Sequence, residues 1–215
     1  MEFVSLDDFL DDVLVEVPGC PIYTARDRIR WAAIEFCKLT GVSVHTTEEI
    51  DWDADCSLVE LPVPSSNVRA WQVLWISTVN GMLHALNRRQ MNERGIIWDG
   101  LEAEAPDSYI RKSNTEIQLV PTPTSDTTSA MSIHCSYLPT RDATKLDAVL
   151  MDEYREAIVA GALSKLLNMS KEEWYDPAEA RERSTWFSFA CSEGRALADK
   201  DFQTGEQTVR MSPMA

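Results

Sequence analysis

The segment from Ile158 to Leu167 constrains the fold most, because its apolar residues cover an unusually wide sector of a helix. A surface helix carries an apolar stripe of roughly 100°, and the apolar residues of this segment cover far more than that. Such a helix must be enclosed by its own domain, and we expect a neighbouring subunit to complete the enclosure. Gly161 and Ala162 allow that neighbour to approach closely.

A second helix follows, and capping residues mark its start. Asp176 can accept hydrogen bonds from the first backbone amides, and Pro177 suits the first helical position. Glu179 lies where the acid of a capping box reaches back to the cap residue. We therefore predict a long last helix that carries Trp186 and Phe187.

The N-terminal residues also predict two helices. Ser5 can cap a short helix that Pro18 and Gly19 end. A longer helix starts near Pro21, and Gly41 ends it. The apolar residues of this longer helix recur at helical spacing: Ile22, Ala25, Ile29, Ala32, Ala33, Phe36 and Cys37.

In the middle of the chain the apolar residues change from helical spacing to every second position, which is the pattern of a strand. Apolar residues alternate over 71–75, and Asn80-Gly81 predicts a tight hairpin turn with a return strand over 82–86. A second hairpin is expected at Ser113-Asn114. The clearest strand has Met131, Ile133, Cys135 and Tyr137 on its buried face, with Ser132, His134 and Ser136 on its wet face. The long segments 87–107 and 121–129 are expected to be loops.

These patterns place strands between two groups of helices, which predicts an α+β fold. We expect residues 1–41 and 139–205 to pack as one helical bundle domain and residues 42–138 to form an inserted antiparallel β-rich domain. Residues 206–215 lack core periodicity and are expected to be a C-terminal tail.

Composition limits the kinds of partner that we expect the protein to bind. The chain has 215 residues and a formal net charge of −15, which disfavours a sequence-independent nucleic-acid clamp because such a clamp needs clustered Lys and Arg. The first ten residues lack the basic and apolar regions of a signal peptide, and no apolar run reaches membrane-spanning length. We therefore expect a soluble protein made in the cytoplasm that contacts no membrane. Five scattered cysteines without a Cys-x-x-Cys pair predict buried free thiols.

Candidate chemistry is sparse. Asp51, Asp53 and Asp55 have the spacing that opens a calcium loop, but Cys56 replaces the required glycine and Pro62 replaces the bidentate glutamate. His134 and Cys135 are neighbours on a strand and therefore face opposite sides. His45 and His84 accompany no nucleophile in a recognisable setting. We predict no metal, no cofactor and no catalytic residue.

Two segments carry a family resemblance. The first has Gly161-Ala162-Leu163 followed by leucines, then Trp174-Tyr175-Asp176-Pro177 and a long aromatic-bearing helix. The second is Val17-Pro18-Gly19-Cys20-Pro21, which precedes a helix ending in Phe36-Cys37. In this order the motifs resemble head-to-tail adaptor proteins of tailed bacteriophages, the group that includes tail tubular protein A.

The resemblance implies a structural, non-enzymatic virion protein of the neck or tail that is assembled in the host cytoplasm. Such adaptors form a homo-oligomeric ring, by analogy of twelve copies, that joins the portal at the capsid vertex to the tail nozzle or tube. Double-stranded DNA passes through the ring without specific binding, and an acidic chain suits that role because carboxylates repel phosphates.

Residues are assigned to three expected contacts. We expect the subunit interface to include Trp31, Ile158, Gly161, Ala162, Trp186 and Phe187. Portal binding is assigned to Phe202, Val209, Arg210 and Met211, and nozzle binding to Arg88, Arg89, Arg94 and Trp98. Two alternatives stay open: a soluble metal-dependent hydrolase that uses an acidic cluster, and a monomeric binding module whose middle hairpins form the recognition surface.

Overall fold

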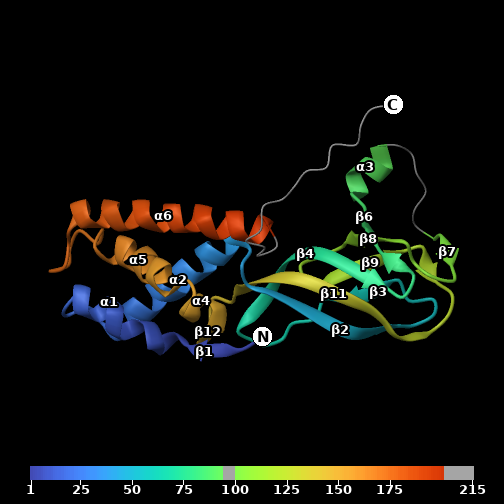
Figure 1. Cartoon of the computed structure of the whole chain (residues 1–215), viewed down its shortest axis with the longest axis horizontal. Coiled ribbons are helices and arrows are strands. Elements are labelled where there is room, and N and C mark those ends of the chain that lie inside the picture. The colour runs from blue at the N-terminus through green and yellow to red at the C-terminus, as the bar shows by residue number, and fades with distance from the viewer. Residues whose placement is uncertain (94–99, 201–215) are drawn as a thin grey trace.

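The computed structural model describes residues 1–93 and 100–200. Figure 1 shows the main helices gathered at one end of the molecule and most strands at the other. The first elements are β1 (Phe3–Ser5), the 3-10 helix η1 (Leu6–Phe9), α1 (Leu10–Glu16) and α2 (Ile22–Thr40). Ser5 caps the first helix as predicted, and it does so through a capping box with Asp8 at the start of η1. Gly41 ends α2 with a left-handed φ of 72°, which glycine adopts without strain.

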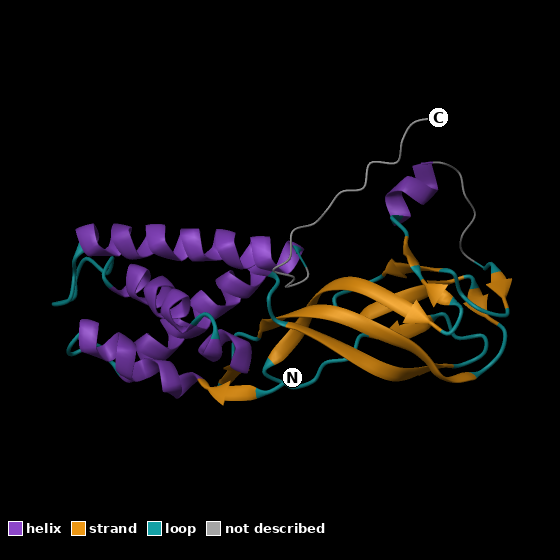
Figure 2. Cartoon of the chain, viewed as in Figure 1, coloured by secondary structure: helices purple, strands orange, loops and turns teal. Residues whose placement is uncertain are grey.

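The C-terminal elements lie against the N-terminal ones. β12 (Lys145–Asp147) pairs antiparallel with β1, and α4 (Ala148–Asp152), α5 (Arg155–Leu166) and α6 (Pro177–Asp199) follow. The helices α2, α5 and α6 all pack against one another, and α1 packs against α2 and α5. Segments from the two ends of the chain therefore build one group of helices (Figure 2).

The middle of the chain forms two four-stranded sheets in which most strand pairs are antiparallel. One sheet has the strand order β2-β11-β4-β5, with β2 (Val44–Trp52), β11 (Thr127–Pro139), β4 (Val68–Thr78) and β5 (Gly81–Met82). Another has the order β3-β9-β8-β6, with β3 (Leu58–Glu60), β9 (Glu116–Val120), β8 (Ser108–Arg111) and β6 (His84–Ala85). The hairpin predicted at Ser113-Asn114 joins β8 to β9 and is confirmed.

Shorter elements complete the strand-rich end. The helix α3 (Arg88–Glu93), the strand β7 (Glu102–Ala103) and the strand β10 (Thr122–Pro123) lie in segments predicted as loops. β10 pairs parallel with β7. The mixture of helices with antiparallel strands confirms the α and β content expected from the sequence.

Two clusters of buried apolar residues support these elements within the described residues. One includes Phe9, Phe36 and Ile158 among the helices, and the other includes Trp52, Ile76 and Ile133 between the sheets. Strand β11 reaches both clusters, because Tyr137 belongs to the sheet cluster and the next residue, Leu138, belongs to the helical one. Strand β11 therefore connects the two cores.

The structure corrects three details of the sequence prediction. The return strand predicted over 82–86 is split, because β5 pairs with β4 while β6 pairs with β8 of the other sheet. Ser136, predicted on a wet face, is buried, since β11 has a register shift between Ser136 and Tyr137 where it meets the helices. Glu179 does not close a capping box: the Asp176 amide donates to the Leu167 carbonyl at 2.9 Å, and Glu179 pairs with Arg183 at 2.6 Å.

Candidate functional site

The predicted subunit-interface residues fall into a buried group and an exposed group. Ile158, Gly161, Ala162 and Phe187 are covered by the chain's own helices. A Cβ placed on Gly161 would lie 2.7 Å from Phe187 ring atoms and 3.0 Å from the Ala32 Cβ, so the close approach at Gly161 joins α5 to α6 and α2. These four residues are buried within the single chain, and their assignment to the subunit interface stays a prediction.

The apolar helix is also enclosed without help from a neighbour. Residues around the circumference of α5 are buried in the single chain, from Ala157 through Leu166. Val159 is only partly buried and Lys165 is exposed. The expectation that a second subunit must complete the enclosure is therefore wrong, because α1, α2 and α6 cover α5.

Trp31 and Trp186 remain exposed, at 36% and 43% of their surface. The Lys165 ammonium lies 4.4 Å from the centroid of the Trp31 ring, a cation–π contact that fixes the orientation of this ring. Trp186 lies on the outer side of α6, one turn before Phe189, which is 58% exposed. Exposed tryptophans beside other apolar side chains are typical of protein interfaces.

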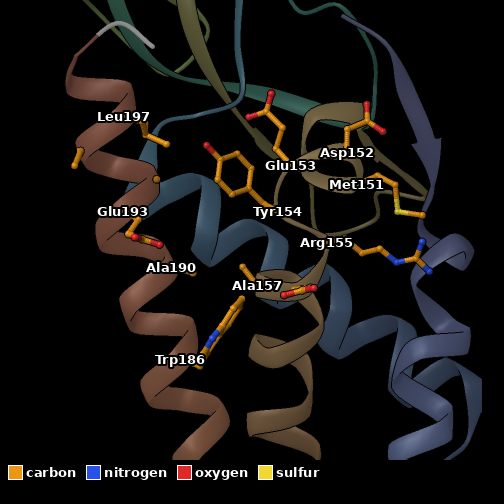
Figure 3. Close-up of a pocket in the computed structure, with 13 residues that line it drawn as sticks. Met151, Asp152, Glu153, Tyr154, Arg155, Ala157, Trp186, Ala190, Glu193 and Leu197 are labelled. Atoms are coloured by element: carbon orange, nitrogen blue, oxygen red, sulfur yellow. The ribbon is translucent and has the colours of Figure 1, made fainter. Parts of the chain in front are cut away.

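Figure 3 shows a crevice between α6 and the start of α5, with Trp186, Ala190 and Leu197 on one wall and Tyr154 and Ala157 on the other. The centroids of the Tyr154 and Phe36 rings lie 4.9 Å apart. The buried Tyr154 hydroxyl has no hydrogen-bond partner among the described residues. Acidic side chains border the crevice: Asp152, Glu153, Glu156 and Glu193. An apolar floor with an acidic border suits an apolar side chain of a protein partner.

A second groove lies on the other side of Trp186, between α1, α5 and α6. Val159 and Leu163 give it an apolar floor, and the exposed Val15 lies at its rim. The arginines in its wall are already paired, Arg155 with Asp12 at 2.5 Å and Arg183 with Glu179 at 2.6 Å. Trp186 therefore projects between two acidic, apolar-floored hollows, and this arrangement is the candidate site for contact with another protein. The sequence analysis identified Trp186 but missed Val15. An apolar residue off the core face of an acidic helix was the signal that could have indicated its exposure.

The other predicted contact residues are mostly beyond the described part of the chain. Phe202, Val209, Arg210 and Met211 lie outside the described residues, and so do Arg94 and Trp98. Arg88 begins the short helix α3. In the same helix Arg89 is exposed and pairs with Glu93 at 2.7 Å.

The candidate chemical residues do not converge. Among the described residues, no three His, Cys, Asp or Glu side chains gather where they could hold a metal ion, and this includes Asp51, Asp53 and Asp55. The His134 Nδ1 lies 2.7 Å from the Thr46 hydroxyl, and its ring stacks on Trp75 with centroids 5.0 Å apart. The metal-dependent hydrolase therefore has no candidate site in this part of the chain.

The cysteines are all free thiols, but only four of them are buried. Burial raises the pKa of the Cys135 thiol to about 11 and that of the Cys191 thiol to about 12, and it also raises the pKa of Cys37. Cys56 is exposed, in the turn after β2, so the prediction of buried thiols is wrong at this position. Burial also lowers the pKa of His45, which lies opposite Cys135 in the ladder.

No helix in residues 1–93 or 100–200 has the length and apolar character needed to cross a membrane.

Comparison with known proteins identifies the family of this chain. No curated protein matches the chain. The family described as SU10 adaptor protein matches residues 4–215, which is nearly the whole sequence. This match agrees with the resemblance carried by the Gly161-Ala162-Leu163 and Trp174-Tyr175-Asp176-Pro177 motifs, and it confirms that resemblance. The chain belongs to the SU10 adaptor protein family and is a structural adaptor of a bacteriophage.

Proposed function

We propose that this adaptor forms a ring that joins the portal at the capsid vertex to the tail nozzle or tail tube and encloses the channel for the genome. By analogy with the adaptors it resembles, the ring has twelve copies. The observation that carries the proposal is the family match over residues 4–215. In this role the protein performs no catalysis and works in the neck of the virion after assembly in the host cytoplasm.

The exposed surface supports a function in protein assembly. Trp186 and Phe189 are one turn apart on α6, so two aromatic rings lie on the same side of an outer helix. An unpaired apolar surface of this kind gains free energy when a partner removes it from water. Trp31 supplies another exposed ring on α2. We assign both tryptophans to contacts between copies or with adjoining rings.

The remaining assignments follow from the proposed architecture. The helical regions 1–41 and 139–205 form the body of each subunit, and residues 42–138 form a β-rich domain that reaches an adjoining ring. The tail of residues 206–215, with Val209, Arg210 and Met211, and the preceding Phe202 bind the portal. Arg88, Arg89, Arg94 and Trp98 bind the nozzle. Because the net charge is −15, copies repel one another in free solution, and the ring forms on a portal template.

Assembly tests the proposal most directly. Light scattering of the protein alone should show small species at micromolar concentration, and addition of the portal protein encoded by the same phage should give a large ring visible by electron microscopy. Trp186→Ala should weaken ring formation, whereas Tyr175→Ala removes a similarly exposed ring, at 44% exposure, that lies before α6 and serves as the control.

A phage that lacks the gene gives a second readout. Its lysates should contain DNA-filled heads and separate tails that fail to join. Normal joining of heads and tails without the protein, or a protein that stays monomeric with portal at every salt concentration, would contradict the proposed ring.

A further inference from the structure

A cationic cleft interrupts the acidic surface of this chain. It lies between α2, β4 and the segment that follows β11, and Trp31, Ile34 and Trp71 supply its apolar walls. Lys38, Arg69 and Arg141 line it together with Arg30, and Asp27 is the acid among the lining residues. A concentration of positive charge in a chain of net charge −15 calls for an acidic occupant.

The cations of the cleft differ in how they are held. The Arg30 Nε donates to the Ala143 carbonyl at 2.9 Å, and its guanidinium lies 3.4 Å from Asp27, so Arg30 is engaged by the chain itself. The Lys38 ammonium lies 5.9 Å from the centroid of the Trp71 ring. Arg69 and Arg141 make no ion pair with any described residue. Lys38, Arg69 and Arg141 are thus available to carboxylates from outside.

The outer ridge of α1 has the complementary character. Val15 is 80% exposed, and Asp11, one turn earlier, makes no ion pair with any described residue. Glu16 is 3.8 Å from Arg183, a loose contact at the surface. The ridge of Asp11, Val15 and Glu16 is therefore a convex apolar knob between carboxylates, whereas the cleft is a hollow with aromatic walls and guanidinium groups.

The ridge and the cleft lie on opposite sides of α5. Glu156 lines the same groove as Asp11 and Val15, whereas Lys165 covers Trp31 at the cleft. At 3.6 residues per turn, Glu156 and Lys165 are about two and a half turns apart and so point in opposite directions. One copy can therefore use both surfaces at once, with a different neighbour at each.

We propose that the α1 ridge of one copy docks in the cationic cleft of a second copy. Val15 enters between the walls formed by Trp31, Ile34 and Trp71, while Asp11 and Glu16 face the cations of the cleft. Contact between two different surfaces is head-to-tail, and repetition of such a contact closes into a ring when its rotation permits. The inference rests on the proposed ring and names the surfaces that build it.

A charge exchange between two variants tests this contact. The first variant carries Asp11→Lys and Glu16→Lys, which makes both its ridge and its cleft basic. The second carries Arg69→Glu and Arg141→Glu, which makes both acidic. Each variant alone should associate about tenfold more weakly than the original chain, as expected when exposed ion pairs become repulsive. A mixture of the two should regain association, because every junction between unlike copies is again complementary.

Sedimentation equilibrium measures the association at protein concentrations up to about 1 mM and at ionic strengths from roughly 0.01 to 0.15 M, where screening changes most. A control with Glu102→Lys and Glu104→Lys alters net charge as much as the first variant but lies at the strand-rich end, and it should associate as the original chain does. Circular dichroism of each variant confirms its fold.

The outcomes separate this contact from the proposed function. Rings that form on portal regardless of these substitutions would overturn the docking and leave the ring intact, as would a mixture no better than its components. Absence of self-association under all these conditions, with and without portal, would overturn both. Binding of a short duplex DNA that Arg69→Glu with Arg141→Glu abolishes, with self-association unchanged, would assign the cleft to nucleic acid and overturn the docking.

Discussion

At the scale of single residues, Gly161 determines how closely three helices approach. The missing side chain at this position leaves room for the Phe187 ring, which lies 2.7 Å from where a Cβ would stand. Ala32 of α2 lies 3.0 Å from the same point, so both neighbours close on the same position. The motif that supports the family resemblance therefore has a packing function within one chain.

Gly161→Leu should destabilise the protein by about 1–3 kcal/mol, because an added side chain overpacks the contact with Phe187 and Ala32. Urea denaturation followed by circular dichroism measures the change in the free energy of unfolding. Glu156→Ala, on the exposed side of the same helix, is the control and should change it by less than about 0.5 kcal/mol. Equal unfolding midpoints for the two variants would show that α5 does not pack closely at Gly161.

Asp147 is a buried carboxyl whose charge opposes folding. It accepts a hydrogen bond from the Ser43 hydroxyl at 2.6 Å and caps α4 through the Val149 amide. Burial raises the pKa of Asp147 above its ordinary value of 3.8, and the bond from Ser43 offsets only part of that effect. The folded state therefore binds the Asp147 proton more tightly than the unfolded state does.

The sign of the pH dependence follows from this raised pKa. Stability contributed by protonated Asp147 is fully present below the ordinary value of 3.8 and is lost as the pH rises through the higher pKa of the folded state. Asp147→Asn can keep the bond from Ser43 but cannot ionise. The unfolding free energy of the original chain minus that of Asp147→Asn should therefore fall as pH increases from 3.8. A difference that stays constant or rises would contradict a raised pKa.

At the scale of elements, the start of α6 depends on one carboxylate. Asp176 accepts from the amides of Ala178 at 3.0 Å and Glu179 at 3.1 Å, so it satisfies two donors that the helix leaves unpaired. Asp176→Ala should lower the unfolding free energy by about 1 kcal/mol. Glu179→Ala should cost only a few tenths of a kcal/mol, since Glu179 makes a surface pair with Arg183 rather than a cap. A loss in Glu179→Ala as large as that in Asp176→Ala, measured by thermal denaturation, would indicate that Glu179 also caps the helix.

The sequence predicted elements whose signal is local and missed those whose partners are distant. Helix α2 follows from its own apolar period and from Gly41, and β11 follows from the alternation of Met131 to Tyr137. Strand β2 has little alternation, and pairing with β11 over six positions, from Thr127↔Trp52 to Ser136↔Val44, defines it instead. The transfer of β6 to another sheet likewise depends on β8, which lies more than twenty residues further along.

The candidate site was predictable only in part for the same reason. Trp31 and Trp186 were identified as aromatic residues of helices, but residue type does not tell which ring the fold covers. Phe187, beside Trp186, is buried against Gly161, whereas Trp186 is exposed. Arg69 and Arg141 come from separate segments, and only the junction of β4 with the end of β11 brings them to one cleft. No spacing pattern in the sequence indicates that these two arginines line the same cleft.

At the scale of the whole molecule, positive charge is concentrated near the junction of the helical core and the sheet core. Strand β11 connects the helical cluster to the sheet cluster, and the cationic cleft lies beside that connection. If copies bury this cleft against acidic ridges, the cations become neutralised at the contacts. The carboxylates that lie outside these contacts then dominate the surface that remains exposed on the ring.

This distribution leads to a prediction about DNA. Rings assembled on portal should not retain double-stranded DNA at physiological ionic strength, because phosphates within roughly 8 Å of an acidic wall are repelled. The carboxylates are expected to line the channel, where many copies concentrate them into a collar. Filter binding of labelled duplex DNA to isolated rings measures retention. Retention by the original rings, or a channel lined mainly by Lys and Arg in an electron microscopy map, would show that the acidic balance serves solubility instead.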